Sequence, residues 1–362
     1  MSAHKKSRET YEAAIRIAIA FAVSVVAFAV IIAICGHDPL DAFAQMVRGA
    51  FVGKFNFGST IEDYILILIV ASGYSLTRRI GYFNLGLEGC LYVGAMFSCA
   101  AGFLLPELPS IVIIPICLGV SMLSGAIWSA IGGVMKAFLN INEACVTIML
   151  NYVAISLTDY LLNNPWSAHS AAPETPAVQP NAMLPKLPLA PSRASVAIFI
   201  AFAVYAFVFF LTFRTTFGFK FRNVADNPRF CDAAGMKSKW IVLGTVMLSG
   251  AFGGLAGGCE ILGVYGNFIQ NFSMNSAFNG IIACLLVKNN LKLLPLSALF
   301  IAFTRTGASG LEYYTGVPSA LIDTVVPILV LFVAMDRLFD YKKLWNWLRH
   351  KKPNKSVVGT DV

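Results

Sequence analysis

The stretch RIGYFNLGLEG, residues 79–89, places a carboxylate and an amide between two long apolar runs. Each of its three glycines weakens a helix by about 1 kcal/mol relative to alanine. A carboxylate at mid-membrane depth costs at least about 2.5 kcal/mol on insertion scales, and it normally faces a bundle interior or a watery cavity. We therefore expect a broken or re-entrant turn in which Asn84 and Glu88 line or brace a solute pathway. The alternative is an interfacial loop, with Glu88 in headgroup water beside Arg79.

A second polar stretch, NINEACVTIMLN at residues 140–151, places three polar side chains on one helical face. Glu143, Thr147 and Asn151 follow one another at intervals of four residues, a spacing that stacks side chains along a helix. Such a stripe forms either a hydrogen-bonded seam with a neighbouring helix or the lining of a pathway. The pattern favours the seam for Thr147 and leaves both interpretations open for Asn151.

A third stretch, SGAFGGLAGGCE at residues 249–260, combines repeated glycines with a terminal carboxylate. Gly250, Gly254 and Gly258 recur at every fourth position, a spacing that lets membrane helices approach closely. We therefore predict that these glycines pack against another helix. Glu260 is either a charge at the outer membrane interface or a residue that borders the pathway.

Several amides follow in YGNFIQNFSMNSAFNG, residues 265–280, where the next membrane crossing is expected. Amide side chains at membrane depth are tolerated only against protein or a water-filled cavity. We therefore predict that Asn275 and Asn279 face a shared aqueous pathway with Asn151.

The longest internal loop expected in the cytoplasm, residues 214–239, contains the sequence of a short helix. Asp226 or Asn227 can cap its start, and Pro228 suits its first turn. Gly235 suits its C-terminal end. The alternative is a solvated basic loop. The residues predicted to contact a partner groove are Phe230, Ala233 and Ala234.

The composition of the whole chain explains why these polar stretches stand out. Of the 362 residues, 57% are hydrophobic and only 13% are charged, whereas soluble domains are about 25% charged. Apolar runs recur at roughly the 20-residue length that crosses about 30 Å of hydrocarbon. We predict an all-α, multi-pass membrane protein with ten spans, at residues 13–35, 60–77, 84–105, 110–136, 143–163, 194–213, 240–262, 269–287, 292–309 and 318–336.

Basic residues indicate how these spans are oriented. With the N-terminus inside, ten spans place 22 of the 27 Lys and Arg residues in the cytoplasm, as the positive-inside rule requires. This predicts cytoplasmic termini at residues 1–12 and 337–362, on either side of a membrane domain at 13–336. The loop at 164–193 contains seven prolines and is expected to be an extended cap exposed outside. Because the topology explains the net charge of +8, no nucleic-acid partner is expected.

The two halves of the membrane domain correspond weakly. Each half, 60–163 and 240–336, contains a long span, a segment interrupted by Gly and Asn, and further spans. Broken helices at matching places are typical of transporter pathways. The sequence has no G-x-x-x-x-G-K-[ST] phosphate loop, so we expect no ATP hydrolysis by this chain. Its cysteines and histidines show no metal-ligand spacing, and no metal site is predicted.

Together these motifs resemble the permease subunits of ABC importers from the branched-chain amino acid, ribose and nucleoside group. GYFNLGLEG is similar to the group's G-x-x-N-[IL]-G-x-E-G signature, and NPRFCDAAG resembles its cytoplasmic A-A-x-x-G loop. NINEACVTIMLN looks like a stretch of the larger permease of nucleoside importers of the simple-sugar type. The chain departs from the family at AFNGIIACLLV, where Asn279 and Val287 replace an acid and a glycine.

The resemblance implies a non-catalytic permease that forms the translocation pathway for nucleosides across a bacterial-type plasma membrane. It implies a second permease subunit in a heterodimer, a cytoplasmic ABC ATPase coupled through residues 226–235, and an extracytoplasmic substrate-binding protein. ATP and magnesium are expected on the ATPase, with no cofactor on this chain. The nearest alternative is a permease for ribose, galactose or another simple sugar. A self-sufficient secondary transporter is a different class, and only Glu88, Glu143 and Glu260 could serve as its ion-coupling residues.

Overall fold

A computed structural model describes residues 38–170, 172–188, 193–273 and 276–315, with isolated residues before position 38. Over these residues the chain is all-α, as predicted, apart from two isolated β-bridges. A π-helical turn, Ile261–Tyr265, directly follows Glu260, the last residue of the helix α10. The helices are α2 (Pro39–Phe51), α3 (Lys54–Arg79), α4 (Leu87–Leu104), α5 (Ser110–Ala137), α6 (Glu143–Asn163), α7 (Ala197–Arg214), α8 (Thr216–Asp226), α9 (Pro228–Ala233), α10 (Ser238–Glu260), α11 (Ser276–Leu286) and α12 (Leu294–Thr315).

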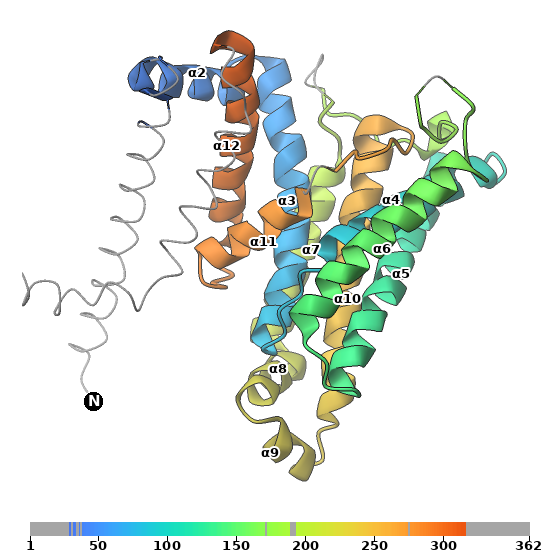
Figure 1. The fold of residues 1–362 in the computed structure, drawn as a ribbon, viewed down its shortest axis with the longest axis vertical. Helices are drawn as coiled ribbons and strands as arrows, with labels where there is room; N and C mark the ends of the chain where they lie inside the picture. The colour runs from blue at the N-terminus through green and yellow to red at the C-terminus, as the bar shows by residue number, and fades with distance from the viewer. Residues whose placement is uncertain are drawn as a thin grey trace, which may run out of the picture.

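The long helices form an elongated bundle whose two ends differ (Figure 1). The helix α2 lies at one end of the bundle, and the short helices α8 and α9 lie at the other. Helix α2 was not predicted from the sequence. It begins with a clear start signal, since the side chain of Asp38 accepts a hydrogen bond from the Leu40 amide and Pro39 occupies the first turn.

The predicted number of ten spans is not supported by the described residues. Six of their helices are long and apolar enough to cross a membrane: α3, α4, α5, α6, α7, and α10 with its π-helical turn. The predicted spans 13–35 and 318–336 lie outside the described residues, apart from isolated positions in the first. The predicted span 269–287 is wrong as a continuous helix, because α11 has only 11 residues. The predicted span 292–309 is the 22-residue helix α12, whose polar residues around Arg305 keep it out of the six.

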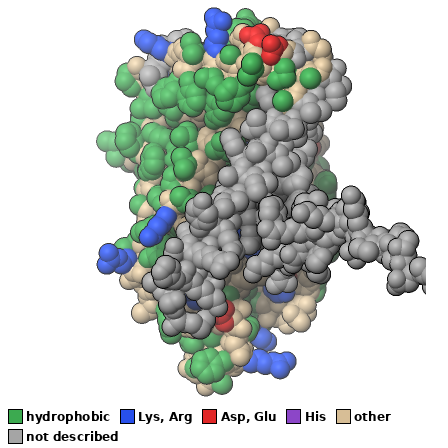
Figure 2. Space-filling model, turned by 90° about the vertical axis from the view of Figure 1, so that its left-hand side faces the viewer, with side chains coloured by type: hydrophobic (Ala, Val, Ile, Leu, Met, Phe, Trp, Pro, Cys, Tyr) green, Lys and Arg blue, Asp and Glu red, His purple; other side chains and the backbone are tan. Residues whose placement is uncertain are grey.

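The core of the bundle is formed by α3, α4 and α10, which are mostly buried. Large side chains of α3 such as Ile67, Leu68 and Tyr74 are fully buried. In contrast, α5, α6 and α7 expose many apolar side chains, including Leu123 and Phe199. Figure 2 shows a broad hydrophobic area on one face, with Lys and Arg side chains above and below it. This distribution matches an environment of lipid in the middle and water at both ends.

The glycine repeat of α10 lies where three helices meet most closely. A Cβ added at Gly254 would lie 2.1 Å from the Ser121 carbonyl oxygen of α5, so no larger residue fits without a backbone shift. Gly250 and Gly258 also face α5, against Ser129 and Ser121 respectively. Gly257, on the adjacent face, approaches the backbone of α4. The structure therefore places the predicted packing residues at the contact of α10 with α5.

The described part of the proline-rich loop lacks regular helix except for the short 3₁₀ turn Pro180–Ala182, and several of its residues are buried against the bundle; its position outside the membrane stays a prediction. Thr175 and Leu184 are buried. The Val178 amide donates to the Gly266 carbonyl, and the Leu184 amide donates to Leu262, both at 2.8 Å. The amide of Gln179 reaches the end of α4. These backbone hydrogen bonds hold the loop against the ends of α4 and α10, because proline-rich chain cannot satisfy its carbonyls internally.

Candidate functional site

The stretch 79–89 forms a tight turn followed by an irregular return into the bundle. Helix α3 ends at Arg79, and Gly81 has a φ of +76°, a conformation that favours glycine. A Cβ at Gly86 would lie 3.1 Å from Thr147 of α6, and one at Gly89 would lie 3.0 Å from the Asn151 side chain. Each glycine therefore answers a local requirement, either for backbone conformation or for the close approach of α6.

Glu88 lies in the first turn of α4, where its side chain is buried. Its Oε1 accepts a hydrogen bond from the Ser273 hydroxyl, and its Oε2 accepts one from the Ala277 amide, both at 2.8 Å. The Ala277 amide belongs to the first turn of α11, where free N–H groups favour an anion. Glu88 therefore caps α11 from a distant part of the chain, and it does not lie in an interfacial loop.

Asn84 and Asn151 connect the same stretch to two further helices. Asn84 is buried, accepts a hydrogen bond from the Gly86 amide, and lies 3.5 Å from the Ser249 hydroxyl of α10. Asn151 donates to the Leu85 carbonyl and accepts from the Gly89 amide, both at 2.8 Å. Both polar atoms of the Asn151 amide are thus bonded to protein, which is the arrangement of a seam.

A half-buried ion pair joins α3 to α12 and contacts the start of α11. Arg305 of α12 lies 3.5 Å from Asp63 of α3 and donates a hydrogen bond to the Ser276 hydroxyl at 2.6 Å. Thr306 donates to the other oxygen of Asp63 at 2.9 Å. Polar contacts therefore run from Glu88 through the first residues of α11 to Asp63. The sequence analysis missed both members of the pair, although a charge inside a predicted span is itself a functional signal.

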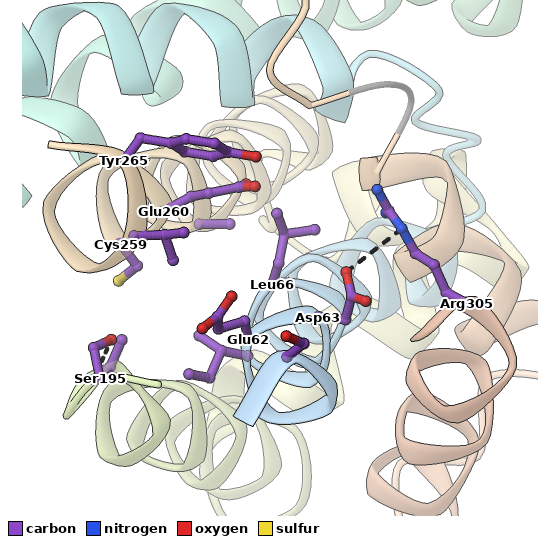
Figure 3. Close-up of a pocket in the computed structure, with 13 residues that line it drawn as sticks. Glu62, Asp63, Leu66, Ser195, Cys259, Glu260, Tyr265 and Arg305 are labelled. Atoms are coloured by element: carbon purple, nitrogen blue, oxygen red, sulfur yellow. Dashed lines mark hydrogen bonds and ion pairs between the residues drawn. The ribbon is translucent and has the colours of Figure 1, made fainter. Parts of the chain in front are cut away.

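A cavity of about 140 Å³ opens beside this ion pair, between α3, α10, α12 and the segment before α7. Figure 3 shows the carboxylates of Glu62 and Glu260 directed toward the space between their helices. Their atoms Glu62 Oε1 and Glu260 Oε2 are buried and accept no hydrogen bond from the described residues. Polar and charged residues that line the cavity include Glu62, Asp63, Ser195, Glu260, Tyr265 and Arg305.

The loop 214–239 contains two helices, α8 and α9, of which the first was not predicted. Asn227 caps α9 by accepting a hydrogen bond from the Phe230 amide, with Pro228 in the first turn. Gly235 follows the helix with a φ of +81°. Phe230, Ala233 and Ala234 are exposed. Asp226 ends α8 and does not cap α9.

The turn after α9 is held by Asp232, which lies outside the candidate membrane spans. Its carboxylate accepts hydrogen bonds from the Ser238 amide and from the Ser238 hydroxyl, both at 2.9 Å. These bonds, first the one from the backbone amide, favour the ionised form and hold the pKa of Asp232 below its usual range. The start of α10 is thereby fixed relative to α9.

The structure brings only some of the predicted pathway residues together. Asn84, Glu88 and Asn151 belong to one buried network around residues 79–89, whereas Glu260 lines the separate cavity. Asn279 is half-buried in α11, and Asn275 lies outside the described residues. Over the part of the chain that is described, no group of His, Cys, Asp and Glu side chains is arranged to hold a metal ion.

A multi-pass helical bundle with a short capped helix and a polar cavity is typical of a membrane transport protein. A simple membrane anchor needs neither feature. The family described as "Branched-chain amino acid transport system / permease component" matches residues 56–335. The chain belongs to this permease family, as its motifs indicated.

Curated relatives of the chain are ABC transporter permeases. The guanosine permease NupP of Bacillus subtilis is 29% identical over 87% of this chain and 91% of its own length. The glucose permease TsgB13 of Haloferax volcanii is 28% identical over 83% of this chain and 82% of its own length. The nucleoside permease NupB of Lactococcus lactis is 24% identical, with coverages of 86% and 88%. No solved structure matches the chain significantly.

Proposed function

We propose that this chain is a permease subunit of an ABC importer and forms the translocation pathway for nucleosides. The observation that carries the proposal is the near full-length similarity to a guanosine permease and a nucleoside permease. A simple sugar is the second candidate cargo, because a glucose permease is similar over almost as much of the chain. Guanosine and glucose both carry neighbouring hydroxyl groups on a ring, so these cargoes share one recognisable chemical feature.

The assignment of pathway residues is part of the proposal. Glu260 borders the cavity and is placed in contact with solute. Asn84, Glu88 and Asn151 are placed beside the pathway as its support, since their polar atoms are already bonded to protein. Asn279, half-buried in α11, contributes an amide to the pathway in this proposal. Asn275 is assigned with it from the sequence alone.

We place the contact with the ATPase at α9. The helix is short, is capped at both ends, and ends in the small exposed residues Ala233, Ala234 and Gly235, which suits insertion into a partner groove. The partner ATPase supplies ATP and magnesium, so this chain needs no nucleotide site of its own. A second permease subunit completes the pathway as a heterodimer in a bacterial-type plasma membrane, and an extracytoplasmic binding protein delivers the cargo.

Uptake by the reconstituted transporter tests the proposal. The full transporter, with its ATPase, second permease and binding protein, should import labelled guanosine only with ATP, and unlabelled nucleosides should compete better than glucose or ribose. Ala233→Glu should lower uptake at least about tenfold. Either ATP hydrolysis continues without transport, or the ATPase dissociates from the permease. Ala172→Glu, the same change at an exposed position of the proline-rich loop, should leave uptake unchanged.

The outcomes separate the two cargo candidates. Competition by glucose or ribose alone would assign the chain to sugar import. Import that continues without ATP would contradict the ABC mechanism. If the Ala233→Glu variant shows wild-type uptake and normal ATPase co-purification, then α9 does not form the contact with the ATPase.

A further inference from the structure

We propose that the cavity between α3, α10 and α12 binds two neighbouring hydroxyl groups of the solute, a ribose diol or a sugar diol. The inference rests on the function proposed above and names a subsite for it within this chain. It assigns Glu62 and Glu260 as the acceptors of the two hydroxyl hydrogens. The orientation predicted from charge places this cavity toward the external end of the bundle, where cargo arrives.

The first argument is the pair of unsatisfied oxygen atoms. Glu62 Oε1 and Glu260 Oε2 are buried from solvent, and no described residue donates a hydrogen bond to either. A buried acceptor without a donor carries a desolvation cost. Such atoms persist when a ligand or ordered water supplies the donors. Two carboxyl groups directed into one space match two adjacent hydroxyl groups.

The second argument is the balance of charge in the cavity. Asp63 is compensated by Arg305 and by the Thr306 hydroxyl, so it is not available to a ligand in the same way. Arg193 attracts Glu62 electrostatically, and its backbone amide also donates a hydrogen bond to the Glu62 carboxyl group, which leaves Oε1 without a donor. Glu260 has no comparable hydrogen-bonding partner among the described residues at its buried oxygen. Because no metal-holding group of side chains is found in the described part of the chain, a neutral hydroxyl donor fits better than a metal ion.

The third argument is size and shape. The cavity volume of about 140 Å³ is close to the roughly 150 Å³ of an engineered protein cavity that binds benzene, so it is large enough for one six-membered or five-membered ring. The Tyr265 side chain lies along one wall beside Glu260 and offers an aromatic surface to the ring carbons (Figure 3).

The cavity also lies one hydrogen bond away from α11. Arg305 lines the cavity and donates to Ser276 in the first turn of that helix. The neighbouring Ala277 amide is held by Glu88. A diol in the cavity is therefore placed beside the point where the chain leaves regular helix, which is where a pathway can change shape.

Protection of a single cysteine tests the subsite without relying on transport. In the full transporter with native cysteines replaced, Ser59→Cys at the cavity wall is labelled with a small maleimide. Guanosine, ribose and glucose should each slow labelling, whereas guanine and 2′,3′-dideoxyguanosine should not. Adding Glu260→Gln should raise the guanosine concentration for half-protection about tenfold, because an NH₂ group replaces one of the two carboxyl oxygens that can accept from the solute hydroxyl. Glu107→Gln, at an exposed position between α4 and α5, should have no effect.

The two proposals fail in different ways. Equal protection by 2′,3′-dideoxyguanosine, or no protection by any hydroxylated compound, would overturn the diol subsite even if the same preparation imports guanosine. Protection by a divalent cation alone would also overturn it. Protection by ribose or glucose in a transporter that imports no nucleoside would support the subsite and contradict nucleoside import. If guanosine and ribose slow the labelling but glucose does not, the subsite binds the diol of a pentose ring and not that of a hexose.

Discussion

Two carboxyl side chains, the buried Glu88 and the half-buried Glu260, occupy regions of the molecule with opposite chemistry. Both oxygens of Glu88 accept hydrogen bonds from the segment that starts α11, and the amide of Asn151 nearby is also fully bonded. Glu260 instead has a buried oxygen without a donor in the described residues, and it faces a cavity. The first region uses its polar groups to hold the fold. The second contains carboxyl oxygens that accept no hydrogen bond from the described residues, and we assign them to the solute.

The largest expected effect comes from breaking the first region at its centre. Glu88→Ala leaves the Ser273 hydroxyl and the Ala277 amide buried without an acceptor, at a cost of about 3–5 kcal/mol. We expect a clear fall in the unfolding midpoint of the purified permease and loss of uptake. The matched control, Glu107→Ala, should change neither. A Glu88→Ala protein with normal stability and lost uptake would show that Glu88, like Glu260 in our proposal, acts in transport and does not hold the fold.

A smaller loss is expected at the seam beside it. Asn151→Leu removes the partner of the Leu85 carbonyl and of the Gly89 amide, each worth about 1–3 kcal/mol when left unsatisfied. The unfolding midpoint should fall, and the guanosine concentration for half-maximal uptake should stay the same. Asn163→Leu, at the exposed end of the same helix, serves as the control. A changed substrate dependence without loss of stability would show that Asn151 lines the pathway.

In the second region stability and transport should move apart. Glu260→Gln keeps the shape of a side chain whose Oε2 has no donor among the described residues, so the unliganded permease should be as stable as the wild type or up to about 1 kcal/mol more stable. Uptake should fall about tenfold under the same conditions. Thermal unfolding and uptake, measured on the same preparation, check both parts. Joint loss of stability and uptake would place Glu260 with Glu88 as a structural carboxylate.

The smallest effect is expected at Asp232, which serves as a reference outside both regions. Asp232→Ala should speed hydrogen exchange several-fold in the first turn of α10 and leave the cavity untouched, because Ser238 loses its acceptor. Since the pKa of Asp232 is lowered by these bonds, its contribution is complete above the usual carboxyl range. It is lost only as the pH falls through the lowered pKa. Hydrogen exchange of wild type and variant at neutral pH measures the difference.

The sequence predicted the helical class, the capped helix α9 and the polar interruption near Glu88, because each depends on local signals. The start of α9 is encoded by adjacent residues, Asn227 and Pro228. The cavity could not be predicted in this way. Glu62 and Glu260 come from helices far apart in the sequence, and their unpartnered oxygens depend on the packing of α3 against α10. Fewer spans are found in the described residues than were predicted, because α11 is too short to cross a membrane and polar residues lower the hydropathy of α12.

The short length of α11 has a consequence for how the protein is made. Its 11 residues rise about 16 Å, roughly half of the hydrocarbon thickness, so it is a poor membrane-insertion signal by itself. The carboxylate that caps it, Glu88, comes 189 residues earlier than Ala277 and leaves the ribosome first. The early part of the chain can therefore act as an internal template, which receives α11 as it emerges. Insertion of the C-terminal half should then depend on correct docking of the N-terminal half, whatever the cargo.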